Sequence, residues 1–193
     1  MESRVRLVPL FTTFVLAAAP GTPAQTADGT PNSALLPCGL RNPVPGGIFA
    51  GHPEGTGLDL ADSPRPVHAV LGVTLDYAEW GHTRWKSPKD TAFSVRVKLE
   101  KPIPWRDRHV THLYYTHLSS LTLERAESDD SEIRIRGGQR LGTSGTANGS
   151  PHLHLGFLLD GNVEQDSWDG LLSDAQIPEL FGRARNGTSL PKN

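Results

Sequence analysis

Two histidines separated by one leucine, His152 and His154, are the residues of this sequence whose spacing best suits chemistry. They follow a glycine-rich stretch and Pro151, and they alternate with Leu153 and Leu155, which is typical of a strand. Because successive strand side chains point to opposite faces, we expect both imidazoles on one face and both leucines in a core. Neutral imidazole is the commonest metal ligand and a general base near neutral pH. The alternative is a pair of strand histidines on a solvated face.

Two residues upstream could join this pair. Asp59 stands in the sequence GLDLA, and His117 stands in the sequence YYTHLS. These side chains are further candidates for metal binding or for acid–base chemistry, although Asp59 could instead cap a turn and His117 could be an ordinary strand residue.

Three segments, GLDLA, YTHLS and GTSGTANGSPHLHLGF, occur in this order. In composition and order they resemble the M23 family (LytM or lysostaphin type) of zinc metallopeptidases, which cut peptide cross-links of bacterial peptidoglycan. The resemblance covers roughly residues 46–162. It implies an all-β fold, an antiparallel sheet or sandwich of the M23 core type, with Zn²⁺ as cofactor and a peptidoglycan peptide as substrate.

The resemblance also implies a role for individual residues. Asp59 and His154 match metal ligands of the family. His152 matches the first histidine of its His-x-His motif and would act beside the metal as general base or transition-state donor. His117 matches the histidine of its Tyr-x-His-Leu motif and would stabilise the oxyanion or shuttle a proton.

The third metal ligand departs from the family pattern, which places a histidine four residues before the aspartate. That position is Gly55 here, and the nearest histidine, His52, lies seven residues before Asp59. An offset of seven changes the strand face, so His52 reaches the metal only if the segment bulges. We expect the ligands His52, Asp59 and His154. The alternatives are a site that has lost its metal or a different third ligand from among Glu54, His68 and His82.

Two main hypotheses for the function follow. The first is an exported zinc endopeptidase that hydrolyses peptidoglycan peptide bonds. The second is a catalytically degenerate module of the same fold that binds peptidoglycan or activates another cell-wall hydrolase. The joint presence of Asp59, His117, His152 and His154 favours the enzyme. A serine hydrolase using Ser144 is disfavoured because no Gly-x-Ser-x-Gly elbow is present, and the His-Glu-x-x-His zincin motif is absent.

The elements that must position these residues are short and rich in β-branched and aromatic residues. Alternating patterns bounded by turn residues predict strands at 66–76, 92–99, 110–118, 133–135, 140–142 and 152–159. Only residues 171–185 hint at a helix. This succession indicates an antiparallel sheet or sandwich.

Two expected insertions, at 79–91 and 101–108, carry Trp80, Trp85 and Trp105. Aromatic side chains beside charges could wall a groove for a glycan or peptide. Packing of the loops onto the domain is the interpretation that we favour. The glycines of 142–149 are expected to form a loop that lets a substrate backbone approach closely.

The chain divides into four expected parts: a signal peptide at 1–24, a flexible tether at 25–45, an M23-like domain at 46–165 and a C-terminal extension at 166–193. Arg4 and Arg6 precede an apolar run over 7–19 and small residues near Ala24, as in a secretory signal. The alternative is a retained N-terminal anchor, although the run is short for a membrane span. We expect export to the periplasm or to the extracellular cell envelope.

The composition argues against several other kinds of site and function. Cys38 is the single cysteine, so neither an internal disulfide nor a multi-cysteine zinc site can form. The formal net charge is −2 and becomes slightly more negative without residues 1–24, which disfavours nucleic-acid binding. We expect a monomer with no membrane span after signal removal.

Overall fold

The computed structural model describes residues 39–49, 55–61, 64–84, 86–165 and 168–181. Its strands are β1 (Ile48–Phe49), β2 (Leu58–Ala61), β3 (Pro66–His68), β4 (Val73–Trp80), β5 (Phe93–Trp105), β6 (Arg108–Leu121), β7 (Ile133–Ile135), β8 (Arg140–Ala147) and β9 (Ser150–Leu159). The helical pieces are a 3-10 turn (Trp168–Gly170) and α1 (Pro178–Phe181). All named strand pairs are antiparallel, which confirms the predicted all-β antiparallel class. Within the described ranges, no helix is long and apolar enough to cross a bilayer.

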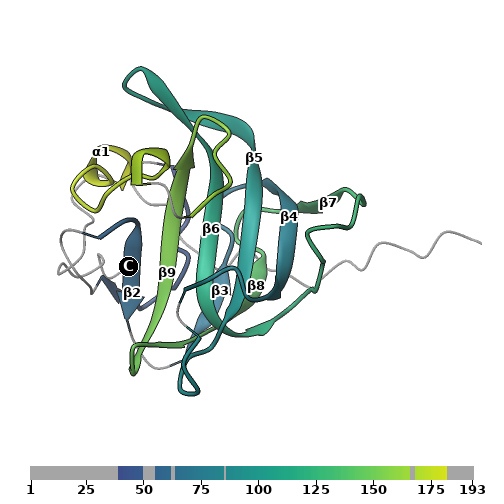
Figure 1. The fold of residues 1–193 in the computed structure, drawn as a ribbon. Coiled ribbons are helices and arrows are strands. Elements are labelled where there is room, and N and C mark those ends of the chain that lie inside the picture. Colours follow the sequence, from purple (N-terminus) through teal and green to yellow (C-terminus); the bar gives the residue numbers. More distant parts are fainter. Residues whose placement is uncertain (1–38, 50–54, 62–63, 85, 166–167, 182–193) are drawn as a thin grey trace, which may run out of the picture.

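Strand β6 is the centre of the sheet (Figure 1). It pairs with β5 along one side, and β5 continues the sheet through β4 to β7. On its other side, β6 pairs first with β9, from Val110 to Thr116, and then with β8, from Leu118 to Leu121. Beyond this division β9 pairs with β2 and β8 pairs with β3. Strand β6 therefore changes partner at residue 117, and β8 and β9 also pair with each other, with Gly145 opposite His152.

The core lies on the faces where the strand leucines and valines point. Leu153 and Leu155 are fully buried, whereas His152 and His154 are partly exposed. This confirms the predicted alternation of faces in β9. Leu40 and Val44, from the segment expected as a tether, also belong to the core.

The expected insertion at 101–108 is wrong. Strand β5 continues to Trp105, and strand β6 begins at Arg108. A two-residue turn joins them, with Arg106 at φ 53°. Pro102 is tolerated because it lies between Lys98 and Ile103, where the pairing with β6 is irregular, whereas Pro104 is paired in register with His109. Trp105 is buried, which agrees with packing rather than with a groove wall.

Other predicted boundaries also change. The segment expected as one strand at 66–76 is two, because β3 pairs with β8 whereas β4 pairs with β5 and β7. Of the region expected as a helix at 171–185, the structure shows a helix only at Pro178–Phe181, and 182–185 lie outside the described residues. Trp80 is 58% exposed, and Trp85 lies outside the described residues.

The glycine stretch expected as a substrate loop is mainly strand β8, followed by a turn at Asn148 and Gly149. A Cβ on Gly142 would lie 2.1 Å from the carbonyl oxygen of Ser120. The glycines in β8 therefore allow close contact with β6 rather than with a substrate.

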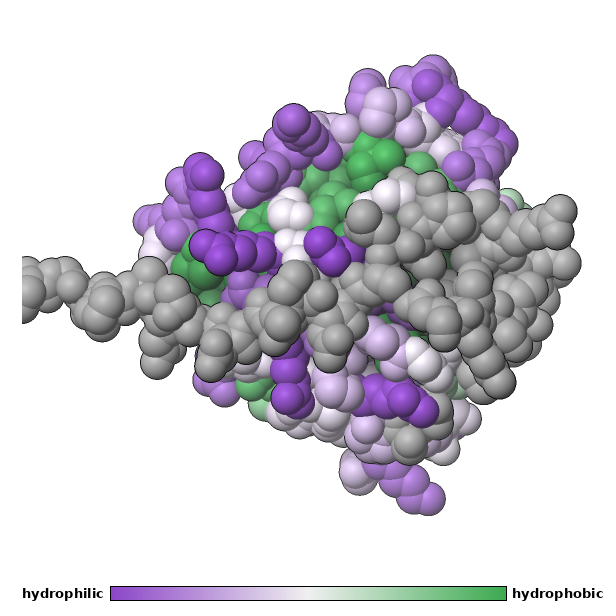
Figure 2. Space-filling model, turned by 180° about the vertical axis from the view of Figure 1, so that it is seen from behind, coloured by the Kyte–Doolittle hydropathy of each residue, from purple (hydrophilic) through white to green (hydrophobic). Residues whose placement is uncertain are grey.

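Seen from behind, the described surface shows protruding hydrophilic side chains around a hydrophobic area (Figure 2).

Candidate functional site

Asp59 and His154 meet because β2 and β9 pair in a register that places them opposite each other. The Nδ1 atom of His154 lies 2.7 Å from Oδ1 of Asp59. A carboxylate only accepts, so the imidazole donates this hydrogen bond. Gly57 makes the approach possible: its φ is 80°, and a Cβ there would lie 2.5 Å from the carbonyl oxygen of Leu155 and 3.0 Å from Nε2 of His154.

His117 stands at the point where β6 changes partner from β9 to β8. Its φ is 64°, which is a strained value for a residue other than glycine, and its side chain is buried. The Oγ1 atom of Thr91 donates to the carbonyl oxygen of His117 at 3.0 Å. A Cβ on Gly145 would lie 2.7 Å from that same oxygen. Thr91 and Gly145 thus fix the backbone turn that aims His117.

The three imidazoles share one place on the sheet. The ring centroid of His117 lies 4.9 Å from that of His152 and 6.1 Å from that of His154. In His152, Nδ1 lies 3.0 Å from the carbonyl oxygen of Ser150. Because a carbonyl can only accept, Nδ1 carries the hydrogen and Nε2 keeps its lone pair. His152 is therefore prepared to accept a proton at Nε2.

The protonation states of His117 and Asp59 follow from their burial and from the charges of the neighbouring site residues. Burial, the largest influence, acts together with the nearby His154 and His152 to lower the pKa of His117 to about 3, against the opposing effect of Asp59. For Asp59, burial is the largest influence and raises the pKa. The hydrogen bond from His154 and the histidine charges outweigh it, so the pKa of Asp59 is lowered overall. The site accordingly combines a neutral imidazole with an ionised carboxylate.

The donor set fits a zinc ion. An aspartate oxygen and an imidazole nitrogen are ligand types that zinc prefers, and at 2.7 Å apart one ion can contact both once the Nδ1 proton is released. Among the described residues, Nδ1 of His117 is a buried polar atom with no hydrogen-bond partner, which marks the site as incomplete by itself.

The third expected ligand, His52, lies outside the described residues, as does the alternative Glu54. The alternative His82 belongs to a separate cluster with Glu79 and Glu127. His68 lies on β3, opposite Arg140 of β8. In the part of the chain that the structure describes, the ring contacts of His117 with His152 and His154 include neither His68 nor His82.

Two supporting residues were missed by the sequence reasoning. They are Thr91 and Tyr114. The hydroxyl of Tyr114 donates to the carbonyl oxygen of His82 at 2.5 Å, and the centroid of the Tyr114 ring lies 6.3 Å from that of His154. Tyr114 had a signal, its place in the YYTHLS motif. Thr91 had none, because its partner is 26 residues away.

No protein-family model and no curated protein matches the chain. Solved structures similar to it include a chain of the SpoIIIAH–SpoIIQ complex, at 19% identity and a TM-score of 0.43, with 69% of this chain and 94% of that chain covered. Another is the catalytic domain of the antimicrobial peptidase lysostaphin from Staphylococcus simulans, at 20% identity, a TM-score of 0.42, and 69% and 88% coverage. A third is a zinc-containing peptidase from Vibrio cholerae, at 12% identity, a TM-score of 0.38, and 66% and 43% coverage.

Proposed function

We propose that this chain is an exported zinc metalloendopeptidase that hydrolyses peptide bonds of bacterial peptidoglycan. One observation carries the proposal: the 2.7 Å contact between Asp59 and His154, with the rings of His117 and His152 beside it. Four side chains that the motifs single out, from three strands far apart in sequence, thus form one cluster. A purely structural origin gives no reason for a strained backbone and a buried unpartnered nitrogen at His117.

Asp59 and His154 would hold the zinc ion, together with His52 as the third ligand. When bound, zinc supplies a Lewis acid that lowers the pKa of a coordinated water and polarises a carbonyl group. Asp59 serves this purpose as an ionised carboxylate because its pKa is lowered overall. The short contact across β2 and β9 holds both ligand atoms in place before an ion arrives.

The remaining two histidines supply proton transfer and charge stabilisation. His152 accepts the proton of the attacking water at Nε2, since Nδ1 donates to Ser150, and delivers it to the departing amine. His117 donates a ring N–H to the oxygen on which negative charge develops. Its ring is held for this by the Thr91 hydrogen bond to its backbone.

The substrate class rests on the resemblance of the three motifs to the M23 family, and export rests on the features of residues 1–24. The direct test is digestion of purified peptidoglycan by the zinc-loaded protein, followed by mass spectrometry of the muropeptides. Loss of cross-linked muropeptides with new amino termini, and with the glycan intact, is expected. Intact muropeptides after incubation with protein shown to contain zinc at Asp59 and His154 would overturn the proposal.

Variants separate the assigned roles. His154→Ala should lose both zinc and activity, whereas His152→Ala should keep zinc and lose turnover. His109→Ala is the matched control, because His109 is an exposed histidine at the start of β6. Retained hydrolysis in both His152→Ala and His154→Ala would contradict the mechanism.

The second candidate function is the degenerate module that binds peptidoglycan or activates another hydrolase. Gly55 favours it, because it occupies the position of a family metal ligand. Such a module would sediment with peptidoglycan and leave muropeptides unchanged, and it would bind with the same affinity when His152 is replaced by alanine.

A further inference from the structure

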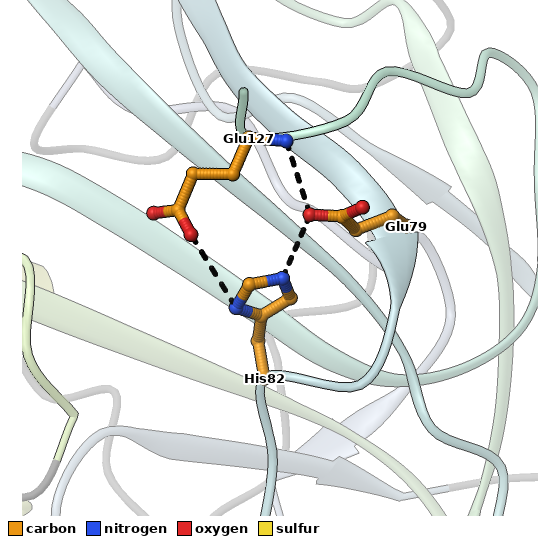
Figure 3. Close-up of side chains that lie close together, drawn as sticks. All are labelled: Glu79, His82 and Glu127. Carbon is orange, nitrogen blue, oxygen red and sulfur yellow. Dashed lines mark hydrogen bonds and ion pairs between the residues drawn. The ribbon is translucent and has the colours of Figure 1, made fainter. Parts of the chain in front are cut away.

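A second cluster of potential metal ligands includes neither Asp59 nor His154 (Figure 3). It combines Glu79 at the end of β4, His82 in the turn that follows, and Glu127 in the connection between β6 and β7. One ligand atom from each lies within 4.8 Å of the others. Three segments of the chain therefore bring two carboxylates to one imidazole.

The two carboxylates face different nitrogens of the ring. Glu79 accepts from Nε2 of His82 at 2.8 Å, and the same Oε1 atom accepts the backbone N–H of Glu127 at 3.0 Å. These bonds fix the hydrogen of a neutral imidazole on Nε2. The Nδ1 lone pair then points toward Oε2 of Glu127, which lies 4.0 Å away. Two electron-rich atoms thus face each other without a hydrogen between them.

A separation of 4.0 Å is too long for a hydrogen bond but suits one metal ion between the two atoms. Zinc bonds of about 2.0–2.1 Å to nitrogen and about 2.0–2.2 Å to carboxylate oxygen together equal or slightly exceed this separation, and a small movement of the exposed Glu127 carboxylate toward His82 would give the shorter ligand spacing of a tetrahedral ion. Glu79 then takes the place of the carboxylate that commonly accepts the other N–H of a metal-binding histidine. Each of the three residues has a distinct task in this arrangement.

The charges around the cluster leave room for a cation. Asp76, Glu79 and Glu127 are three carboxylates, and the buried guanidinium of Arg96 contacts Asp76 and Glu127. Arg96 binds Oε1 of Glu127 and leaves Oε2 for the ion. Exposed Arg84 and Lys86 also line the neighbouring cavity, where water screens their charge.

The space for further ligands is next to the facing atoms. A cavity of about 300 Å³ is lined by His82 and Glu127 but not by Glu79. This matches the assignment of Glu79 to the far nitrogen and of the ion to the cavity side. Water molecules can complete the coordination from this cavity, since two protein ligands leave positions open.

We propose that Nδ1 of His82 and Oε2 of Glu127 bind a divalent transition-metal ion, with Glu79 orienting the imidazole. The proposal does not rest on the proposed peptidase function. The test is equilibrium dialysis of the purified chain against zinc, with the bound zinc measured by elemental analysis. Glu127→Gln should bind about one zinc ion fewer than the unsubstituted chain, and so should His82→Asn.

Glu124→Gln is the matched control, because Glu124 is an exposed carboxylate in the same connection; its zinc content should be unchanged. The full number of ions in both Glu127→Gln and His82→Asn would overturn the second site. His154→Ala separates this result from the peptidase proposal. A loss in His154→Ala alone supports only the Asp59 site, and a loss in Glu127→Gln alone supports only the His82 site.

Discussion

The hydroxyl of Thr91 donates to the carbonyl oxygen of His117 at 3.0 Å and accepts the backbone N–H of Thr146 at 2.8 Å. It thus joins the backbone of β8 to the residue with the left-handed conformation in β6. Without this hydroxyl, the turn that aims the His117 ring loses a specific constraint. The strain at His117 is then held mainly by the pairing of the flanking residues.

Thr91→Val keeps the side-chain shape and removes these hydrogen bonds. A lost hydrogen bond is worth about 0.5–1.5 kcal/mol, so we expect a decrease in kcat of up to about tenfold. Zinc content should stay the same, because Thr91 contacts neither Asp59 nor His154 in the described hydrogen bonds. Steady-state kinetics on a peptidoglycan peptide measures this. Thr122→Val, at an exposed threonine, serves as control, and an unchanged kcat in Thr91→Val would show that Thr91 does not position His117.

Gly57→Ala should weaken zinc binding. The added Cβ would lie 2.5 Å from the carbonyl oxygen of Leu155 and 3.0 Å from Nε2 of His154, so β2 must shift away from β9. The positive φ adds a cost of about 1–2 kcal/mol. Gly161→Ala isolates that cost, because Gly161 has a φ of 79° and nothing within 4 Å of the added atom. Dialysis should show lower zinc affinity for Gly57→Ala only; equal affinity in the two variants would refute the steric account.

Tyr115→Phe should lower stability without changing metal binding. The buried Tyr115 hydroxyl accepts the backbone N–H of Val70 at 3.1 Å. Its removal leaves that N–H buried and unsatisfied, which costs about 1–3 kcal/mol. Urea unfolding should show this decrease in the free energy of unfolding. If the midpoint does not move, another acceptor or water has replaced the hydroxyl.

The sequence predicted well the features that depend on local periodicity. The shared face of His152 and His154 follows from the two-residue repeat of a strand, and β7 was predicted with its observed bounds. The contact between Asp59 and His154 spans 95 residues. No spacing rule reaches that far, so its expectation came only from the order of the motifs.

The wrong predictions have physical reasons. Pro102 and Pro104 suggested an insertion, yet both lie in a long hairpin, and Pro102 lies in its irregular stretch, where the missing N–H group is not required. The glycines at 142–149 suggested a loop, yet Gly142 and Gly145 are needed where two strand backbones approach each other. The cluster of Glu79, His82 and Glu127 could not be predicted, because Glu127 reaches it from a distant connection.

Stability should fall as the pH drops below about 6.5, the ordinary histidine pKa. Burial lowers the pKa of His112, Asp76 opposes this, and Arg96 and Lys98 add to it. Burial likewise lowers the pKa of His68. Each of these histidines has a lower pKa in the folded chain than in the unfolded chain. Between these two values the unfolded chain binds more protons, so the stabilisation is complete above about pH 6.5 and is lost on acidification.

His112→Gln should flatten this dependence. Each buried histidine contributes at most about 1.4 kcal/mol per pH unit, so the variant should lose less stability than the unsubstituted chain between about pH 7 and about pH 5. Urea unfolding at several pH values measures the slope. His109→Gln is the control, because His109 is exposed on the same strand. The carboxylates with lowered pKa, such as Asp160, titrate below this window. Identical slopes for His112→Gln and the unsubstituted chain would therefore mean that His112 takes up its proton equally in both states.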